Sequence, residues 1–403
     1  MKAHLRPQVA TTSTLPCVGG RVGRNSWRIV ATAIIGSSAC SPVRVTLPVR
    51  PLENAARYSE WSEPVRLVRT TSLALDRVGK RQPRLDSTLR RSRTGAGVAI
   101  YVFDGGVSEQ HRELSGRMRM GFDAFPSAPR LCNPHGTAVA GAAAGATLGV
   151  APDAEIIDVK IINCDHLRGS VTAILAAARW AVEDHAKHPG QPAVANWSFA
   201  VDTGRIVPEI DRAATILHDA GFLIVAAAGN IETDACRVSP ANAPHVIVVG
   251  ASALVDRGDG SGRRRDVRAP NTAWGPCISL FAPGDSVELP SLDRGLPSVM
   301  IWNGTSMAAG YVSGAAALIL ERDPAASPER VAQTLLSSAT QNVVDERRGD
   351  GLRSRLLYIG PMERIVASVG DGGWGMRDGG RAKAVIPSAA RDLGHGRTIT
   401  SSR

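Results

Sequence analysis

Short apolar runs alternate with helix-patterned segments between residues 95 and 290, and this alternation constrains the fold more than any other feature of the chain. The runs are mostly aliphatic and β-branched, which is typical of strands covered on both faces. They are VAIYVF (98–103), EIIDVKII (155–162), AVANWSF (193–199), FLIVAAAG (222–229) and HVIVVGAS (245–252). Apolar residues recur at helical spacing in segments 170–188 and 207–221. Because strands that alternate with helices need crossover connections, we predict a three-layer α/β fold with a mainly parallel central sheet and helices on both faces.

Four polar residues stand where such elements begin or end. Asp104 follows the first strand in a Gly-Gly turn, and Asn230 follows the fourth strand. His135 begins a helix of small residues, and Ser306 begins the apolar helix 303–320. Each has an ordinary structural explanation by itself, since such residues are common in turns and helix caps. Parallel sheets, however, carry their catalytic groups at the carboxyl ends of the strands.

Together the four residues supply the roles that acyl transfer needs. Ser306 would attack the carbonyl carbon, and His135 would take its proton and later give it to the leaving amine. Asp104 would hold the imidazole in one tautomer and stabilise its charged form. Asn230 would donate a hydrogen bond to the oxyanion. The pattern therefore predicts a nucleophilic serine site.

The motifs around these residues resemble those of subtilisin-family serine proteases, closest to the proteinase K and aqualysin branch. The chain has Asp-Gly-Gly at 104–106, His-Gly-Thr-Ala-Val-Ala-Gly at 135–141 and Gly-Thr-Ser-Met-Ala at 304–308. Asp, then His, then Ser is also the chain order of subtilisin. The resemblance covers about residues 71 to 360. It implies a subtilisin-like fold and a serine endopeptidase that works through an acyl-enzyme intermediate.

The chain departs from the family pattern near three of these residues. Gly105 stands where the family has Thr, and Ala138 stands where it has a second His. After the nucleophile, Gly310 replaces a Pro, so we expect Ser306 to be held less firmly. No proton-transfer partner is lost. The alternative is a catalytically weakened or inactive subtilisin fold that binds peptides.

The resemblance also implies which residues bind substrate and which form disulfides. The substrate-pairing segments would be Ser198, Phe199 and Ala200 on one side and Ala228 and Gly229 on the other. The disulfides would be Cys132–Cys164 and Cys236–Cys277. Two disulfides would place the protein in an oxidising compartment.

The chemistry itself requires no cofactor, but relatives hold a structural calcium ion. Its backbone carbonyl ligands would be Pro244 and Val246. Ser279 stands at the position of the carboxylate ligand. Because an anionic ligand is missing, we expect weak calcium binding or none.

The chain divides into a leader and short linker (1–70), a peptidase domain (71–360) and a Gly/Arg-rich tail (361–403) that we expect to be unstructured. Within 21–40, arginines precede the apolar run IVATAIIG, as in a secretory signal. We therefore expect a protein secreted to the cell envelope or the extracellular space. Cys40 lacks the leucine expected of a lipid-attachment site, and no run is long enough to span a bilayer.

The formal net charge is +10, and much of the excess arginine lies before residue 95 and after residue 361. Basic tails suggest a second alternative, a nucleic-acid- or surface-binding protein. No aromatic-interleaved basic patch accompanies the charge, so we expect no nucleic-acid partner. We expect a monomer whose partners are protein or peptide substrates. Proteolysis that survives deletion of 361–403 would distinguish the enzyme from the binding protein.

Overall fold

The computed structural model describes residues 65–201, 206–345, 354–360 and the backbone of 398–400. All of these residues belong to one compact unit, Ser62–Arg403. The signal-like segment and most of the expected tail lie outside the described residues. None of the helices in the described part of the chain is long and apolar enough to cross a membrane.

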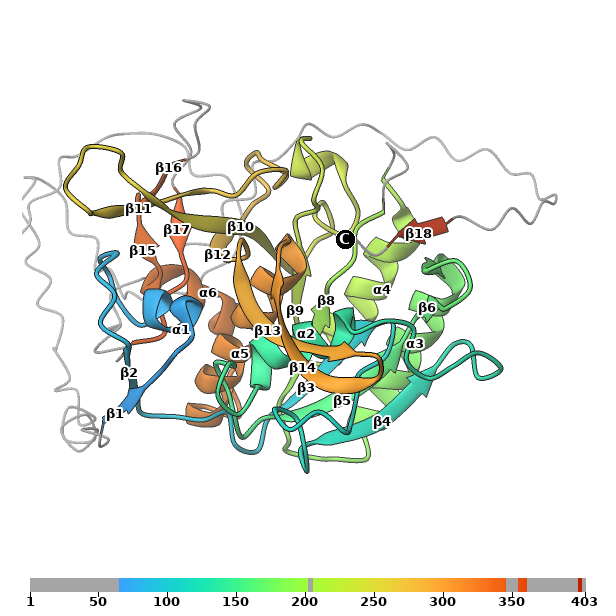
Figure 1. The fold of residues 1–403 in the computed structure, drawn as a ribbon. Coiled ribbons are helices and arrows are strands. Elements are labelled where there is room, and N and C mark those ends of the chain that lie inside the picture. Colours follow the sequence, from blue (N-terminus) through green and yellow to red (C-terminus); the bar gives the residue numbers. More distant parts are fainter. Residues whose placement is uncertain (1–64, 202–205, 346–353, 361–397, 401–403) are drawn as a thin grey trace, which may run out of the picture. The chain divides into compact units, whose positions relative to one another are not determined.

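A mainly parallel sheet forms the centre of this unit, as the sequence predicts (Figure 1). Its strand order is β15-β17-β12-β10-β9-β8-β3-β5-β4. Outside this order, β11 pairs with β10, and β16 pairs with β11. The strands are β3 (Ala99–Asp104), β4 (Met118–Asp123), β5 (Glu155–Lys160), β8 (Ala193–Trp197), β9 (Leu223–Ala227), β10 (Val246–Asp256), β11 (Arg264–Arg268), β12 (Leu280–Pro283), β15 (Thr340–Gln341), β16 (Val344–Asp345) and β17 (Arg355–Leu356). Only the pairings of β10 with β11 and of β15 with β17 are antiparallel.

Helices cover both faces of the sheet, which confirms the three-layer α/β fold (Figure 1). Along β3, Ile100 and Val102 enter one apolar core, whereas Tyr101 and Phe103 enter the other. The first core is completed by α2 (His135–Ala144), α5 (Thr305–Arg322) and α6 (Pro328–Ser338). The second core is completed by α3 (Val171–His185) and α4 (Pro208–Asp219). Both faces of the central strands are therefore dry, which explains their continuous hydrophobicity.

The predicted elements are present with small shifts of their ends. The run 155–162 divides into β5 and the short β6 (Ile162–Asn163). The run 245–252 continues to Asp256, where β10 leaves its parallel neighbours and pairs with β11. Ser327 caps α6 by accepting a hydrogen bond from the Arg330 amide, with Pro328 at the first helical position.

The folded unit begins before the expected boundary at residue 71. The strand β1 (Arg66–Arg69) pairs with β2 (Thr88–Arg91), and α1 (Leu73–Val78) lies between them in sequence. At the other end, β18 (Thr398–Thr400) pairs with β7 (Arg168–Ser170), so the tail is not uniformly without structure. Main-chain pairing at a free strand edge requires no particular side chains, and the sequence pattern therefore gave no sign of it.

The hairpin of β13 (Val287–Asp293) and β14 (Leu296–Trp302) leads directly into α5 (Figure 1). Its two-residue turn has positive φ at both positions, 50° at Arg294 and 82° at Gly295. One strand packs on α2, because a Cβ at Gly141 would lie 2.3 Å from Pro290 Cγ. The hairpin thus packs on α2, which begins with His135, and leads in the chain into α5, which carries Ser306.

Candidate active site

Asp104 is the last residue of β3, and glycines let the chain turn sharply after it. Its carboxylate is buried, and Oδ1 accepts the Gly105 amide at 2.7 Å. Gly106 has φ of 107°, and a Cβ there would lie 2.3 Å from the Arg130 carbonyl oxygen. A Cβ at Gly136 would lie 2.4 Å from the Gly106 carbonyl oxygen. Only glycine at these two positions allows α2 to begin so close to Asp104.

His135 is the first residue of α2, and its side chain faces Asp104 instead of capping the helix. Nδ1 lies 2.9 Å from both carboxylate oxygens of Asp104. The backbone amide of His135 donates to Asn133 Oδ1 at 3.0 Å. Nε2 is buried and has no hydrogen-bond partner among the described residues. The carboxylate fixes the tautomer, because Nδ1 must carry the proton that it donates.

Two opposed effects set the pKa of His135. Burial is the larger single effect and lowers this pKa, because it disfavours the charged ring. The charge of Asp104 and its hydrogen bond act in the other direction. Together these two contributions exceed the effect of burial, and the pKa of His135 is raised. Asp104 therefore stabilises the imidazolium that would form if Nε2 accepted a proton.

Ser306 is the second residue of α5 and is not its cap. Gly304 holds the cap position with φ of 142° and makes no side-chain capping bond. The Ser306 hydroxyl is buried and donates to the Ser198 carbonyl oxygen at 3.3 Å. In return, the Ser198 hydroxyl donates to the Ser306 carbonyl oxygen at 3.1 Å. The start of α5 is thereby tied to the segment that follows β8.

Asn230 lies after β9, and Thr305 orients its side chain. Oδ1 accepts the Thr305 amide at 2.9 Å and the Thr305 hydroxyl at 2.8 Å. Because a backbone N–H can only donate, the side-chain atom that faces it must be the oxygen. Nδ2 is therefore turned away, toward Gly304, where an added Cβ would lie 3.0 Å from it. Nδ2 is buried and has no hydrogen-bond partner in the described part of the chain.

The expected substrate-pairing segments lie close to one another. Ser198, Phe199 and Ala200 follow β8 and are buried, and Ala228 and Gly229 follow β9. A Cβ at Gly229 would lie 3.7 Å from Ala200 Cβ, and the φ of Gly229 is 104°. The Gly229 amide donates to the Thr305 hydroxyl at 3.2 Å. Thr305 thus contacts both Asn230 and one of these segments.

Two contacts at the site are absent from the sequence argument. Thr305 is in the Gly-Thr-Ser motif, but its spacing does not indicate that it orients Asn230. Trp302 ends β14 and meets the His135 ring edge-on, with 6.2 Å between ring centroids. Its only sequence signal is its position four residues before Ser306.

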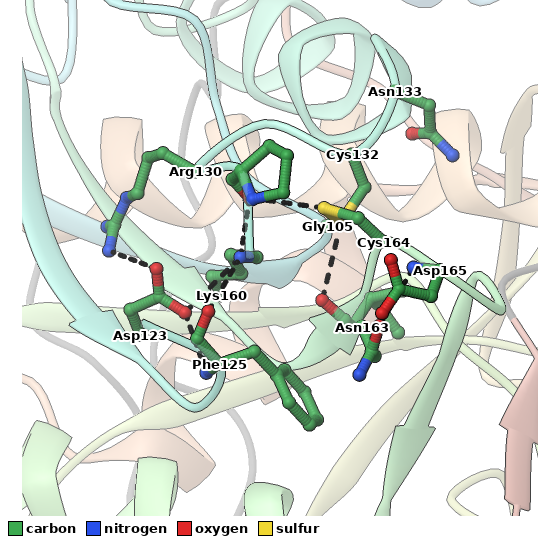
Figure 2. Close-up of a disulfide and its surroundings, with 12 residues drawn as sticks. Gly105, Asp123, Phe125, Arg130, Cys132, Asn133, Lys160, Asn163, Cys164 and Asp165 are labelled. Carbon is green, nitrogen blue, oxygen red and sulfur yellow. Dashed lines mark hydrogen bonds and ion pairs between the residues drawn. A yellow bond between two sulfur atoms is a disulfide. The ribbon is translucent and has the colours of Figure 1, made fainter. Parts of the chain in front are cut away.

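The Cys132–Cys164 disulfide lies directly beside the turn after Asp104 (Figure 2). The Cys132 amide donates to the Gly105 carbonyl oxygen at 2.9 Å. A Cβ at Gly105 would lie 3.5 Å from Cys132 Cβ, which is an ordinary contact. The other bridge joins Cys236 to Cys277. Both pairs are those that the resemblance implies.

Buried and partly buried charged side chains lie close to this disulfide (Figure 2). Lys160 is fully buried and donates to the Pro129 carbonyl oxygen at 2.6 Å. Arg130 lies 3.4 Å from Asp123 and 2.8 Å from Asp158. Burial raises the pKa of Asp158 to about 7, although Arg130 opposes this shift. The sequence does not reveal these contacts, because a charged residue gives no sign of its partner.

The residues at the calcium position do not fit that ion well. Ser279 Oγ accepts the Val248 amide at 3.1 Å, and the Ser279 amide donates to the Val248 carbonyl oxygen at 2.9 Å. The hydroxyl is therefore engaged by the backbone, and it carries no charge. Calcium prefers several oxygens that include carboxylates. Pro244 and Val246 could supply only neutral carbonyl oxygens.

Comparisons with known proteins agree with this geometry. The sequence profile described as "Subtilase family" matches residues 95–352. The extracellular serine proteinase of Thermus sp. (strain Rt41A) is 35% identical over 89% of this chain and 84% of its own length. The alkaline serine exoprotease A of Vibrio alginolyticus is 32% identical, and the match covers 70% of this chain and 49% of that relative. The crystal structure of a cold-adapted subtilisin-like serine proteinase superposes with a TM-score of 0.61 at 32% identity, and the match covers 71% of this chain and 97% of that one.

Proposed function

Because this chain belongs to the subtilase family and is a serine-type peptidase, we propose that it cleaves peptide bonds as an endopeptidase through Asp104, His135 and Ser306. The observation that carries the proposal is the environment of His135. Nδ1 is held 2.9 Å from both oxygens of Asp104, while Nε2 is buried and has no partner among the described residues. A ring held in this way is ready to accept a proton at Nε2.

In the proposed reaction, Ser306 Oγ attacks the substrate carbonyl carbon as His135 Nε2 accepts the hydroxyl proton. Asp104 keeps its negative charge and stabilises the imidazolium. His135 then protonates the leaving amine, and an acyl-enzyme ester forms on Ser306. Water attacks this ester in the second half of the reaction, with His135 again acting first as base and then as acid.

Asn230 is the proposed side-chain donor to the oxyanion. Its Oδ1 is occupied by Thr305, and its Nδ2 is left with no described partner. A buried donor with no partner costs free energy in the absence of substrate. The cost is offset if a negative oxygen develops beside it in the transition state.

Ser306 donates to the Ser198 carbonyl oxygen and not to His135, so it must rotate before it can react. Catalytic hydrogen bonds are often long or misaligned without substrate and tighten in the complex. A peptide that pairs with Ser198–Ala200 would approach this same carbonyl. We therefore assign the Ser198 contact to the resting enzyme.

The departures from the family motifs are compatible with turnover. At Gly105 a side chain would fit, but the amide that binds Asp104 is a backbone group and does not depend on it. At Gly310 a Cβ would lie 2.7 Å from the Val139 carbonyl oxygen, so the glycine lets α5 pack closely on α2. This close packing opposes the loosening of Ser306 that the missing proline suggests. Ala138 is buried in α2.

We further propose that the protein is exported. The Thermus relative is named an extracellular serine proteinase. Two disulfides need an oxidising compartment, and this chain has four cysteines paired in that way. We propose protein and peptide substrates, a monomeric enzyme and no required cofactor.

Fluorophosphonate labelling together with casein hydrolysis tests the proposal. The wild-type protein should be labelled once, and Ser306→Ala should lose both labelling and hydrolysis. His135→Ala should lower the rate as severely, because the two residues act as one unit. Ser313→Ala is the matched control, since Ser313 is a buried serine of the same helix that bonds to Asn196. Hydrolysis that persists in Ser306→Ala would contradict the assignment, and a wild-type protein with neither labelling nor hydrolysis would indicate the inactive peptide-binding protein.

A further inference from the structure

Three side chains far from Ser306 converge on one point of the surface. His218 is on α4, His245 directly precedes β10, and Glu329 is in the first turn of α6. Their ligand atoms, two imidazole nitrogens and one carboxylate oxygen, all lie within 4.8 Å of one another. The proposed reaction uses none of the three.

The three side chains of the cluster are in direct contact. His218 Nε2 lies 2.5 Å from Glu329 Oε1. The rings of His218 and His245 are stacked, with 3.8 Å between centroids and 20° between planes. Neutral imidazole is the form that binds metal ions.

Neighbouring groups hold two of the ligands in place. Glu329 lies in the first turn of α6, directly after the cap residue Ser327 and the proline at the first helical position. His218 Nδ1 lies 3.4 Å from Asp219 Oδ1. If Nδ1 keeps its proton on this carboxylate, removal of the proton shared with Glu329 leaves the Nε2 lone pair for a metal, which is the usual arrangement of a metal-bound histidine.

The cluster lies at the amino-terminal edge of the sheet, opposite the candidate active site. His218 precedes β9 and His245 precedes β10, whereas Asp104 ends β3 and Asn230 follows β9. The helices α4 and α6 cover opposite faces of the sheet. An ion bound here would join both helical layers to the start of a central strand.

We propose that His218, His245 and Glu329 form a Zn²⁺ site with a water molecule as the fourth ligand. Two nitrogens and one carboxylate oxygen are a common zinc ligand set, and zinc accepts tetrahedral geometry. Bonds of about 2.0–2.2 Å require ligand atoms roughly 3.3–3.5 Å apart, so the cluster must contract by about 1–1.5 Å at most. His245 and Glu329 are exposed and can move, while the less exposed His218 stays in place. Zinc displaces the proton between His218 and Glu329, which leaves to solvent.

Calcium is the wrong ion for this cluster. Calcium prefers six to eight oxygen ligands, whereas the site offers two nitrogens and one carboxylate. The cluster is therefore distinct in chemistry from the backbone carbonyls of Pro244 and Val246, although these residues flank His245 in the sequence. Competition by calcium therefore tests which kind of ion the cluster binds.

Zinc chloride alone is the probe, added to the metal-free full chain after treatment with a serine-protease inhibitor. Calorimetric titration should show one Zn²⁺ per chain, and zinc at about a hundredfold its Kd should raise the Tm by several degrees. His218→Ala, His245→Ala and Glu329→Gln should each weaken binding at least tenfold, because even residues behind the ligands contribute that much. His188→Ala is the matched control, since His188 lies just after a helix end and outside the cluster.

The outcomes separate clearly. Binding that is lost in the three variants, retained in His188→Ala and unaffected by millimolar calcium supports the site. No binding at millimolar zinc, or binding that is unchanged in His245→Ala and Glu329→Gln, overturns it. Displacement of zinc by calcium also overturns it, because calcium would not compete for imidazole ligands. The exposed positions of His245 and Glu329 keep the test valid even if His218→Ala fails to fold.

Discussion

At the scale of single residues, two of the buried polar atoms that lack partners among the described residues belong to groups that would act on substrate. They are His135 Nε2 and Asn230 Nδ2. In each case the other polar atom of the same side chain is fully engaged, by Asp104 and by Thr305 respectively. Leaving such atoms unpaired costs about 1–3 kcal/mol each. The resting site therefore holds its donors and acceptors in place before substrate arrives.

Asn230→Ala should lower kcat by roughly 10²–10³ while KM changes little, because the lost hydrogen bond forms only in the transition state. Thr305→Val keeps the side-chain shape but removes the hydroxyl that orients Asn230. It should reduce kcat less, by about five- to tenfold, as expected for one neutral hydrogen bond. Steady-state kinetics on a peptide substrate measures both. A rise in KM with unchanged kcat in Asn230→Ala would mean that Asn230 binds the ground state.

Asp104→Asn should move the acid limb of the kcat/KM profile to lower pH. His135 must be neutral to act as a base, so activity is lost as the pH falls through its pKa. Burial lowers this pKa and Asp104 raises it above the ordinary value. Without the charge of Asp104, burial lowers the pKa of His135 unopposed by that charge, and the acid limb shifts to lower pH. The rate itself should fall by about 10⁴, because the tautomer is no longer fixed. An acid limb that shifts upward, or does not shift, would show that Asp104 does not control the ring.

At the scale of elements, α2 and α5 pack closely together, and their first turns carry His135 and Ser306. Glycines on α5 make the contact close. A Cβ at Gly310 would lie 2.7 Å from the Val139 carbonyl oxygen, and one at Gly314 would lie 2.4 Å from the Ala143 carbonyl oxygen. Both obstacles are backbone atoms of α2, which cannot move without moving the helix that begins with His135.

Gly310→Ala should therefore destabilise the protein by about 1–3 kcal/mol, the usual cost of overpacking a core. Helix propensity alone would give the opposite sign, since Ala is favoured over Gly by up to about 1 kcal/mol inside a helix. Urea unfolding gives the sign and the size. Ala309→Ser changes the preceding buried residue and reports whether any added atom in α5 has the same effect. An increase in stability in Gly310→Ala would mean that the helices are not in close contact at this point.

The central elements could be predicted because their hydrophobic pattern depends on burial on both faces. The strand β4 was missed, since its residues are only partly buried and alternate with arginine and glycine. The hairpin β13–β14 was missed because apolar residues such as Met300 and Ile301 are exposed and give no period-two signal. The contact of Trp302 with His135 depends on how this hairpin lies over α2. A relation between elements that are distant in the sequence cannot be derived from periodicity.

The candidate site was predicted more fully than the fold around it. Asp104, His135, Asn230 and Ser306 were singled out by motif, and the resemblance to the subtilisin family gave each a role. The part played by Thr305 could not be predicted, because it depends on which oxygen or nitrogen of Asn230 faces the start of α5. The loosening of Ser306 by Gly310 remains a prediction. The close approach of Gly310 to the Val139 carbonyl oxygen could not be read from the sequence, because it depends on how α5 packs on α2.

At the scale of the whole molecule, covalent links join segments that are far apart in the sequence. Cys132–Cys164 closes a separation of 32 residues beside the active site, and Cys236–Cys277 closes one of 41 between the loop after β9 and the approach to β12. Each disulfide lowers the entropy of the unfolded chain, which stabilises the fold by about 3–4 kcal/mol on the chain-entropy estimate. The proposed zinc cluster lies at the opposite edge of the sheet and acts only when the ion is present.

Thermal stability should therefore depend heavily on the disulfides and little on calcium. A metal stabilises a fold by RT ln(1 + [L]/Kd), which is small when binding is weak, and Ser279 offers a backbone-bonded hydroxyl in place of a carboxylate. A disulfide acts at any calcium concentration. Starting from metal-free protein excludes a contribution from zinc. Adding millimolar calcium should change the Tm by less than about 2 °C, whereas a reductant should lower it by on the order of 10 °C or more. Ser279→Asp restores the anionic ligand and should make the Tm respond to calcium. A large calcium effect in the wild-type protein, with little loss on reduction, would mean that the calcium site is intact and that the bridges contribute little to stability.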